Sequence, residues 1–300
     1  MRSSAELVQR AWSAGTAIPA FNTPYRPIIE PTIRALRDTE CFGFITVARL
    51  EWEKFEAGSP RAVYAEYQRV KDERYSRLHL DHVPVIDEDG QRVDYAALIA
   101  DALDCGYPSV MVDGSRLPLE ENIAVTRKIV AMAHARGAPV EAELGAVLGH
   151  EEGPLPPYEE LFASARGFTD PEEAARFVRE TAVDWLSVAI GNVHGAISAA
   201  TRNGKKVEAK LNIEHLARIR DATGVPLVLH GGTGISREQL RAAIRNGIAK
   251  INIATATRQP YEAARKESAA AAQEAAYQAA VQTIADLGVA GSAHIINPPE

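Results

Sequence analysis

The stretch PLVLHGGTGISREQLRAAIRNGIAKINIAT, residues 226–255, contains one complete strand–helix–strand unit. An apolar run rich in Val and Leu comes first, and a glycine-rich turn follows it. Ser236, a residue type that favours helix starts, begins a segment whose apolar residues recur at helical spacing. A second β-branched run ends the unit, so the pattern predicts two strands joined by a helix.

The same alternation continues through the rest of the chain. Several helical segments have clear start signals, such as Pro118 and Asp170-Pro171. Eight strand–helix units predict an α/β protein with a closed (β/α)₈ barrel, also called a TIM barrel. A doubly wound open sheet is the alternative, but no G-x-G-x-x-G turn opens the first helix. The apolar runs cover residues 17–22, 42–48, 77–83, 109–114, 139–145, 185–191, 226–231 and 249–255.

The length and composition fit one domain. A chain of 300 residues with 46% hydrophobic and 24% charged residues can bury a large core. We therefore expect a single barrel domain over residues 1–300. An Ala-rich segment over about 261–289 predicts a C-terminal helix that packs on the barrel or on a partner subunit, which indicates a homodimer or homotetramer.

Charge and apolar patterning exclude some classes of partner. A formal net charge of −7 disfavours nucleic-acid binding, which requires clustered Lys and Arg. No apolar run is long enough to span a membrane, and the N-terminal residues alternate as in a helix rather than a signal peptide. Cys41 and Cys105 have apolar neighbours and are expected to be reduced. We expect a cytoplasmic protein without a nucleic-acid or membrane partner.

Polar residues stand where several predicted strands end. The carboxyl ends of the strands in such a barrel gather at one rim. His82, His194 and His230 follow three of these strands, and three imidazoles are a ligand number that catalytic Zn²⁺ uses while keeping an open position. A lone histidine at a strand end is more often a packing residue, but three at one rim predict a zinc site. Other polar residues on these strands are Asp81, Glu141, Glu143 and Asn252.

The strand period separates His79 from its neighbours. Successive side chains of a strand point to opposite faces, so a regular strand would put His79 and Asp81 on one face and Leu80 and His82 on the other. His79 also lies deeper than the rim. We expect it to be a hydrogen-bonded core residue that supports a metal ligand rather than binding the metal.

Glycines follow two of the candidate metal ligands. Gly231, Gly232 and Gly234 precede a helix that starts near Ser236, and such loops let backbone N–H groups approach a phosphate. The loops after strands seven and eight of TIM barrels commonly build a phosphate site. A tight connection between strand and helix is the plainer alternative.

Several ordered motifs resemble a known family. HLDH (79–82), VEAELG (140–145), VAIGNVHG (188–195), LVLHGGTGI (227–235) and KINIAT (250–255) are similar to the class II, zinc-dependent fructose- and tagatose-bisphosphate aldolases. The resemblance covers nearly the whole chain. It implies reversible aldol cleavage of a ketose (bis)phosphate, or of a related phosphorylated or acidic sugar, through a zinc-stabilised enediolate. The products would be dihydroxyacetone phosphate, or an analogue of it, and an aldehyde.

The resemblance also implies roles for individual residues. Asp81 would transfer the proton at the hydroxyl or carbonyl group of the bond being made or broken. Glu151, with the neighbouring Glu152 as the alternative, would remove the carbon-bound proton. Glu143 matches a second or alternative metal position, with Asp113 as a weaker candidate, and a second divalent ion or a monovalent cation could accompany the zinc ion. The implied metal ligands are His82, His194, His230 and Glu143, and the implied substrate-binding residues are Asn22, Gly195, Gly231, Thr233, Asn252 and Thr255.

Several positions depart from the family's pattern. Ser198 stands where many members have a lysine that neutralises phosphate, and Val83 stands where glycine is preferred. Arg116 replaces a histidine, and Arg49 lies near the rim in an unusual segment. These changes surround the substrate rather than the metal, so the substrate need not be fructose 1,6-bisphosphate. The two arginines could bind an acidic group, or both could be solvated.

Two other functions remain open from the residues alone. A zinc-dependent hydrolase on a TIM barrel generally needs an H-x-H pair on the first strand, and PAFN (19–22) contains none. A barrel that binds a sugar phosphate without turning it over is the second alternative, for which Ser198 would be a sign of lost phosphate affinity.

Overall fold

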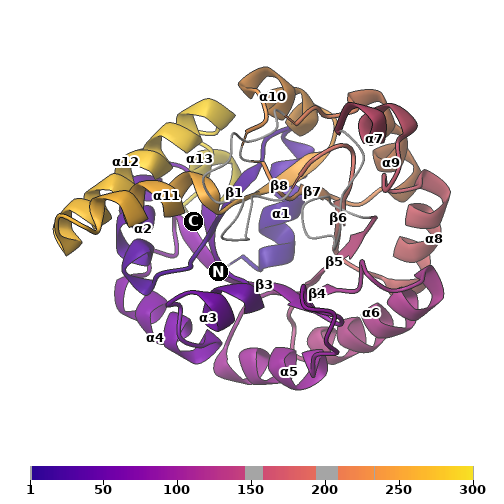
Figure 1. Ribbon diagram of the computed structural model, residues 1–300, viewed down its shortest axis with the longest axis horizontal. Helices are drawn as coiled ribbons and strands as arrows, with labels where there is room; N and C mark the ends of the chain where they lie inside the picture. Colours follow the sequence, from indigo (N-terminus) through magenta and orange to yellow (C-terminus); the bar gives the residue numbers. More distant parts are fainter. Residues whose placement is uncertain (1, 146–157, 194–208, 233, 300) are drawn as a thin grey trace.

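The computed structural model describes residues 2–145, 158–193, 209–232 and 234–299. Its centre is a closed barrel of eight parallel strands in chain order, in which β1 pairs with both β2 and β8 (Figure 1). The predicted (β/α)₈ barrel is therefore confirmed. The strands are β1 (Ile18–Asn22), β2 (Gly43–Val47), β3 (Ser76–Pro84), β4 (Val110–Asp113), β5 (Val140–Leu144), β6 (Trp185–Val188), β7 (Leu227–Leu229) and β8 (Ile248–Ile253).

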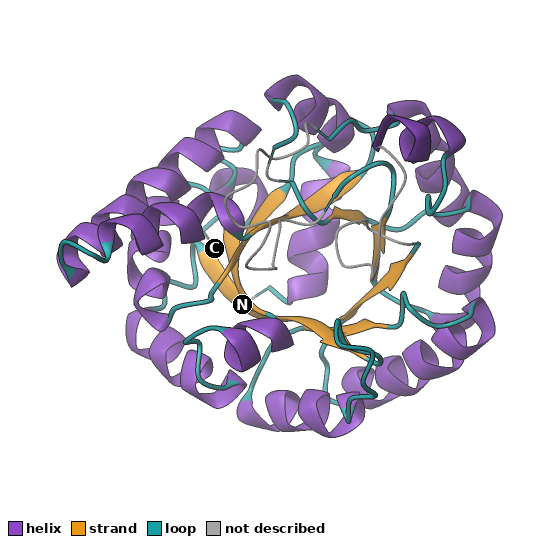
Figure 2. Ribbon diagram, in the orientation of Figure 1, coloured by secondary structure: helices purple, strands orange, loops and turns teal. Residues whose placement is uncertain are grey.

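Helices surround the ring of strands (Figure 2). Parallel neighbours require a crossover connection, and helices supply it here. None of the described helices combines the length and the apolar character that a membrane span requires. The helices are α1 (Ser4–Ser13), the 3₁₀ helix η1 (Arg26–Ile28), α2 (Ile29–Asp38), α3 (Arg49–Lys54), α4 (Pro60–Val70), α5 (Tyr95–Cys105), α6 (Leu119–His134), α7 (Tyr158–Ser164), α8 (Pro171–Thr181), α9 (Ile213–Thr223), α10 (Arg237–Arg245), α11 (Thr255–Ala264), α12 (Ala269–Leu287) and α13 (Ala293–Ile296).

The outer faces of the strands pack against this ring of helices. Leu80 of β3 and Val112 of β4 belong to the same apolar cluster as Ile99 of α5 and Ile129 of α6. Strands that are covered on both faces read as nearly continuous apolar runs, which is why the sequence shows them clearly.

The interior of the barrel is apolar at the end where the strands begin. Leu7 and Val8 of α1 pack there with Ile18, Phe44 and Trp185. Viewed along the barrel, α1 lies inside the ring of strands (Figure 1). The apolar cluster closes this end of the barrel.

The Ala-rich C-terminal segment contains two helices where the sequence pattern predicts one over about 261–289. The helix α11 ends at Ala264, and α12 begins at Ala269 and packs against α11 and α2. The hydroxyl of Ser268 accepts a 3.0 Å hydrogen bond from the backbone N–H of Ala271 and so caps the new helix. The break follows from this cap, because a serine side chain competes with helical backbone bonds.

Candidate metal and active site

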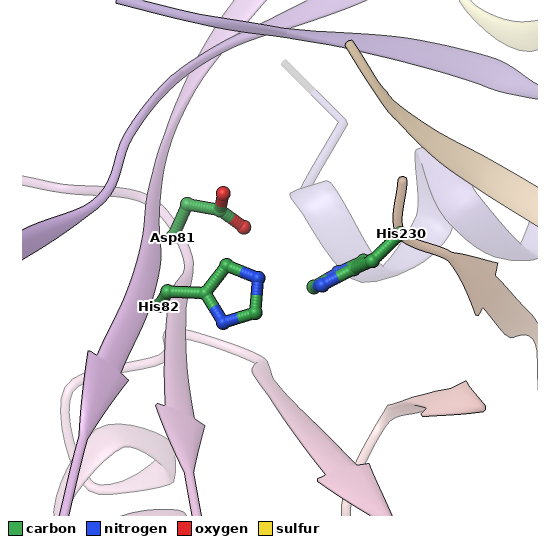
Figure 3. A group of neighbouring side chains, drawn as sticks. All are labelled: Asp81, His82 and His230. Atoms are coloured by element: carbon green, nitrogen blue, oxygen red, sulfur yellow. The ribbon is translucent and has the colours of Figure 1, made fainter. Parts of the chain in front are cut away.

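Three side chains meet where the barrel strands end (Figure 3). Asp81 and His82 lie near the end of β3, and His230 directly follows β7. The rings of His82 and His230 are arranged edge to face, with centroids 4.3 Å apart. Each of the three residues offers one ligand atom, and these atoms lie within 4.8 Å of one another. The group therefore has the dimensions of a metal site.

A bulge in β3 turns two consecutive side chains toward the same interior. Regular alternation would put His82 on the face of Leu80, which packs outward. Instead, the pairing of β3 with β4 shifts between Leu80 and Val83, and His82 has a φ of +21°. The extra residue brings His82 inward beside Asp81, and Val83 returns to the outer apolar layer.

Carboxylates orient both imidazole rings. Nδ1 of His82 lies 3.0 Å from Oδ2 of Asp113. Nε2 of His230 lies 2.9 Å from Oε1 of Glu141, and its Nδ1 lies 3.2 Å from Oε2 of Glu143. Histidines that bind metals usually have one ring N–H held by a carboxylate in this way. The contacts indicate that Nε2 of His82 and Nδ1 of His230 are the nitrogens that would hold a metal ion.

The same carboxylates suit the site to a cation. Burial opposes protonation of His82, but the negative charge of Asp81 and the hydrogen bond to Asp113 raise its pKa to about 10. Burial and the nearby His82 oppose protonation of His230, yet its hydrogen bonds to Glu141 and Glu143 raise its pKa. Positive charge is stabilised here, and a divalent ion would take the place of these protons. Imidazole and carboxylate donors fit zinc and similar divalent ions.

Glu141 connects the histidine pair to a buried lysine. Its Oε2 lies 2.9 Å from Nζ of Lys250 and accepts a 2.6 Å hydrogen bond from Nε1 of Trp185. Its Oε1 contacts His230, as described above. All four side chains are buried. One carboxylate therefore holds the orientation of His230 and balances the charge of Lys250.

Lys250 is a candidate that the residue pattern alone did not single out. Its Nζ donates a 2.7 Å hydrogen bond to Oδ1 of Asn252 and lies 3.6 Å from Oδ1 of Asp81. A signal was available, because the strand period puts Lys250 on the same inner face as Asn252. Lysine is rarely buried without a paired charge, and here two carboxylates supply it.

Two amides and the lysine hold Asp81. Nδ2 of Asn22 donates to Oδ2 of Asp81 over 2.9 Å, and Nδ2 of Asn252 lies 3.0 and 2.9 Å from the two carboxylate oxygens. Burial opposes ionisation of Asp81, but the positive charges of Lys250 and His82 keep its pKa below the ordinary range. Asp81 is therefore ionised and oriented, as a proton acceptor must be.

Two further groups of three residues bring ligand atoms equally close: His82, Asp113 and Glu143, and also His79, Asp81 and Glu141. The first group shares His82 with the main site, so Glu143 and Asp113 lie next to any metal bound there. The second group contains the two carboxylates that contact Lys250. The positive charge beside this second group is therefore the ammonium group of Lys250.

His79 lies deeper in the barrel, as the strand period predicts. Its Nδ1 is 3.0 Å from Oγ of Ser109, and its ring stacks on Phe44 with centroids 5.8 Å apart. Its Nε2 lies 3.4 Å from Oε2 of Glu141. Through Glu141, His79 is linked to His230.

The structure describes only part of the predicted site. The predicted residues that lie outside the described ones are His194, Gly195, Thr233, Glu151 and Glu152, together with Ser198. Asn22 and Asn252 are brought together with Asp81. Gly231 follows His230 with a φ of +68°, a conformation that favours glycine, and Thr255 is the first residue of α11.

Arg49 does not offer an unbalanced charge to a substrate. Its guanidinium lies 3.2 Å from Oδ2 of Asp87 and 3.8 Å from Oε1 of Glu53. Asp87 belongs to the acidic segment that follows β3. This pairing favours a structural role for Arg49 at the rim.

Comparisons with known sequences agree with the motifs. The model of the family described as fructose-bisphosphate aldolase class-II matches residues 2–292. A fructose-bisphosphate aldolase of Geobacillus stearothermophilus is 44% identical over 154 residues, which are 51% of this chain and 48% of that protein. A 6-phospho-5-dehydro-2-deoxy-D-gluconate aldolase of Halalkalibacterium halodurans is 43% identical over 178 residues, which are 59% of this chain and 53% of that protein. The chain thus spans about half the length of these curated relatives.

Solved structures match over nearly the full length. The YdjI aldolase from Escherichia coli K12 is 30% identical with a TM-score of 0.75, covering 96% of this chain and 98% of that chain. A putative fructose-1,6-bisphosphate aldolase from Coccidioides immitis is 28% identical with a TM-score of 0.77, and the match covers 97% of this chain and 98% of that chain. The likeness therefore includes the whole barrel.

Replacing Lys250 with methionine should destabilise the protein, because Glu141 and Asp81 would lose their buried counter-charge. Leaving such a charge unpaired typically costs about 3–5 kcal/mol of unfolding free energy. Denaturant unfolding of the chelator-treated protein measures the change, and the exposed Lys266→Met is the matched control. A loss below about 1 kcal/mol, as expected for a surface pair, would contradict the assigned role.

The metal-free protein should lose stability as the pH rises. The pKa of His82 is raised from 6.5 to about 10 in the folded state. Its stabilising effect is therefore complete below about pH 6.5 and is lost as the pH approaches 10. Thermal unfolding in the presence of a chelator measures this dependence. The His82→Asn variant should lack most of it, and an unchanged pH dependence in that variant would show that another group is responsible.

Proposed function

Because this chain belongs to the class II fructose-bisphosphate aldolase family, we propose that it catalyses the reversible aldol cleavage of a phosphorylated ketose or sugar acid. The products would be dihydroxyacetone phosphate, or a close analogue of it, and an aldehyde. The observation that carries this proposal is an ionised, buried Asp81 beside two imidazoles that carboxylates orient. This combination supplies a proton acceptor and a cation site within one small space.

His82 and His230, with His194 from outside the described residues, would hold the metal ion. Zinc bound at such a site polarises a carbonyl oxygen and stabilises the negative charge that develops when the carbon–carbon bond breaks. Glu143, which contacts Nδ1 of His230, is suited to a second or alternative position of the ion. A monovalent cation near the substrate phosphate is a further part of the proposal.

Asp81 would transfer the proton of the substrate hydroxyl. In the cleavage direction, its carboxylate accepts this proton as the aldehyde carbonyl forms, and it returns the proton in the synthesis direction. Asn22 and Asn252 fix the carboxylate through three amide contacts, which aligns it before the substrate arrives. Glu151 would exchange the proton on the carbon of the dihydroxyacetone phosphate half.

The substrate phosphate would bind at the loops after β7 and β8. The loop after His230 begins with Gly231 and Gly232, and Gly232 packs so close to Ile251 that an added Cβ would come within 2.9 Å of that side chain. A chain without side chains here can present backbone N–H groups to an anion. Thr255 at the first position of α11 lies at the end of the neighbouring strand. We propose that Gly231 and Thr255, with Gly195 and Thr233 from outside the described residues, hold the phosphate.

The two curated relatives act, by name, on fructose bisphosphate and on 6-phospho-5-dehydro-2-deoxy-D-gluconate. Both compounds are phosphorylated, and one is also an acid. We propose the same range for this chain: ketose mono- and bisphosphates and phosphorylated sugar acids. Because Asp87 and Glu53 already balance Arg49, we do not assign Arg49 to the substrate.

A substrate screen with a metal control tests the proposal. The zinc-loaded protein should cleave at least one such sugar to a triose phosphate and an aldehyde, and a chelator should stop the reaction until zinc is added back. Zinc-dependent cleavage of esters or amides alone would favour a hydrolase. Binding of sugar phosphates without turnover would favour a non-catalytic barrel.

Replacing Asp81 with alanine should separate proton transfer from metal binding. Turnover should fall by about 10²- to 10⁴-fold, the usual contribution of a positioned acid or base. Zinc content, measured by atomic emission, should stay near that of the wild type. His82→Ala should instead lower the zinc content. Nearly full activity in the Asp81 variant would refute its proposed role.

A further inference from the structure

Ser187 is a buried hydroxyl residue that none of the roles above uses. It lies in β6, and its side chain is fully buried. Its neighbours Leu186 and Val188 belong to the outer apolar layer, whereas Trp185 packs inside the barrel. Because side chains alternate along a strand, Ser187 faces the interior together with Trp185.

Ser187 and Trp185 each hold one carboxylate of the neighbouring strand β5. The pairing of the two strands places Glu143 opposite Ser187 and Glu141 opposite Trp185. Oγ of Ser187 donates a 3.1 Å hydrogen bond to Oε2 of Glu143. Nε1 of Trp185 donates a 2.6 Å hydrogen bond to Oε2 of Glu141. Since these carboxylates contact the two ring nitrogens of His230, β6 supplies one donor behind each contact.

A metal ion would change the environment of Glu143 more than that of Glu141. Nδ1 of His230, the nitrogen assigned to the metal, lies 3.2 Å from Oε2 of Glu143. A proton on this nitrogen can donate to Glu143, but a bound ion takes the place of that proton. Among the described residues, the hydroxyl of Ser187 is then the hydrogen-bond donor that remains for this oxygen. A buried carboxylate that lost this donor as well would be less stable in its position.

Glu143 is also close to the other imidazole of the site. Ligand atoms of Glu143, His82 and Asp113 lie within 4.8 Å of one another. A carboxylate oxygen of Glu143 can therefore approach an ion held beside His82. The hydrogen bond from Ser187 orders this carboxylate before the ion arrives, and such ordering lowers the entropy cost of binding.

We propose that Ser187 is a positioning residue of the metal site, which holds the carboxylate of Glu143 beside His230 in the orientation that favours the ion. The inference rests on the proposed function, because it requires a metal ion at His230. Ser187 acts through Glu143. Its effect should therefore appear in the metal affinity and disappear when the Glu143 side chain is removed.

Zinc affinity, measured by competition with a chromogenic chelator, tests the proposal. Ser187→Ala should weaken zinc binding by about 10-fold, the lower end of the loss expected when a partner of a metal ligand is removed. Ser76→Ala is the matched control, since Ser76 is an equally buried strand serine at the start of β3 that contacts Tyr67 and Asp72 instead. The control should bind zinc as the wild type does. An equal loss of affinity in Ser76→Ala would overturn the proposal, because it would indicate a general loosening of the barrel.

A double-mutant cycle shows whether Ser187 acts through Glu143. Glu143→Ala should itself weaken zinc binding, and adding Ser187→Ala should change the affinity by less than about twofold, because the shared interaction is already absent. The same 10-fold loss in both backgrounds would contradict the positioning role, as would wild-type affinity in Ser187→Ala alone. A wild-type protein that binds no zinc in this assay would instead refute the proposed metal-dependent function, and the role of Ser187 with it.

Discussion

The ammonium group of Lys250 lies between the carboxylates of Glu141 and Asp81 inside the barrel. All three groups are removed from water, so each needs the others to remain charged. Glu141 uses its other oxygen to orient His230, while Asn22 holds Asp81, the proposed proton acceptor. One buried cation thereby links the carboxylate that orients a proposed metal ligand to the carboxylate proposed to transfer the proton. The two carboxylates explain why a lysine can be fully buried inside the barrel.

The fold could be read from the sequence because its physical causes are local. Strands buried on both faces give continuous apolar runs, and helices between them give their own start signals. The positions of Asp81 and His230 at strand ends also followed from the pattern. The inward turn of His82 did not, since it depends on a bulge that shifts the pairing of β3 with β4. A period of two predicts the opposite face for this residue.

Other features depend on contacts between distant segments. Lys250 shares a face with Asn252, so its inward direction could be deduced, but its two carboxylate partners come from β3 and β5. Glu51 looks like an ordinary surface acid in the charged segment ARLEWEK (48–54). Its burial becomes evident only when α3 is placed against the barrel. The break before Ala269 depends on a single serine cap within an otherwise helical composition.

The central claim is that His82 and His230, oriented by Asp113 and Glu141, hold the metal that the chemistry requires. X-ray absorption spectroscopy of the zinc-loaded protein tests this claim most directly. The account predicts imidazole scattering around zinc in the wild type and a loss of part of that signal in His82→Ala. A spectrum without imidazole ligands, or one that the His82 substitution leaves unchanged, would contradict it.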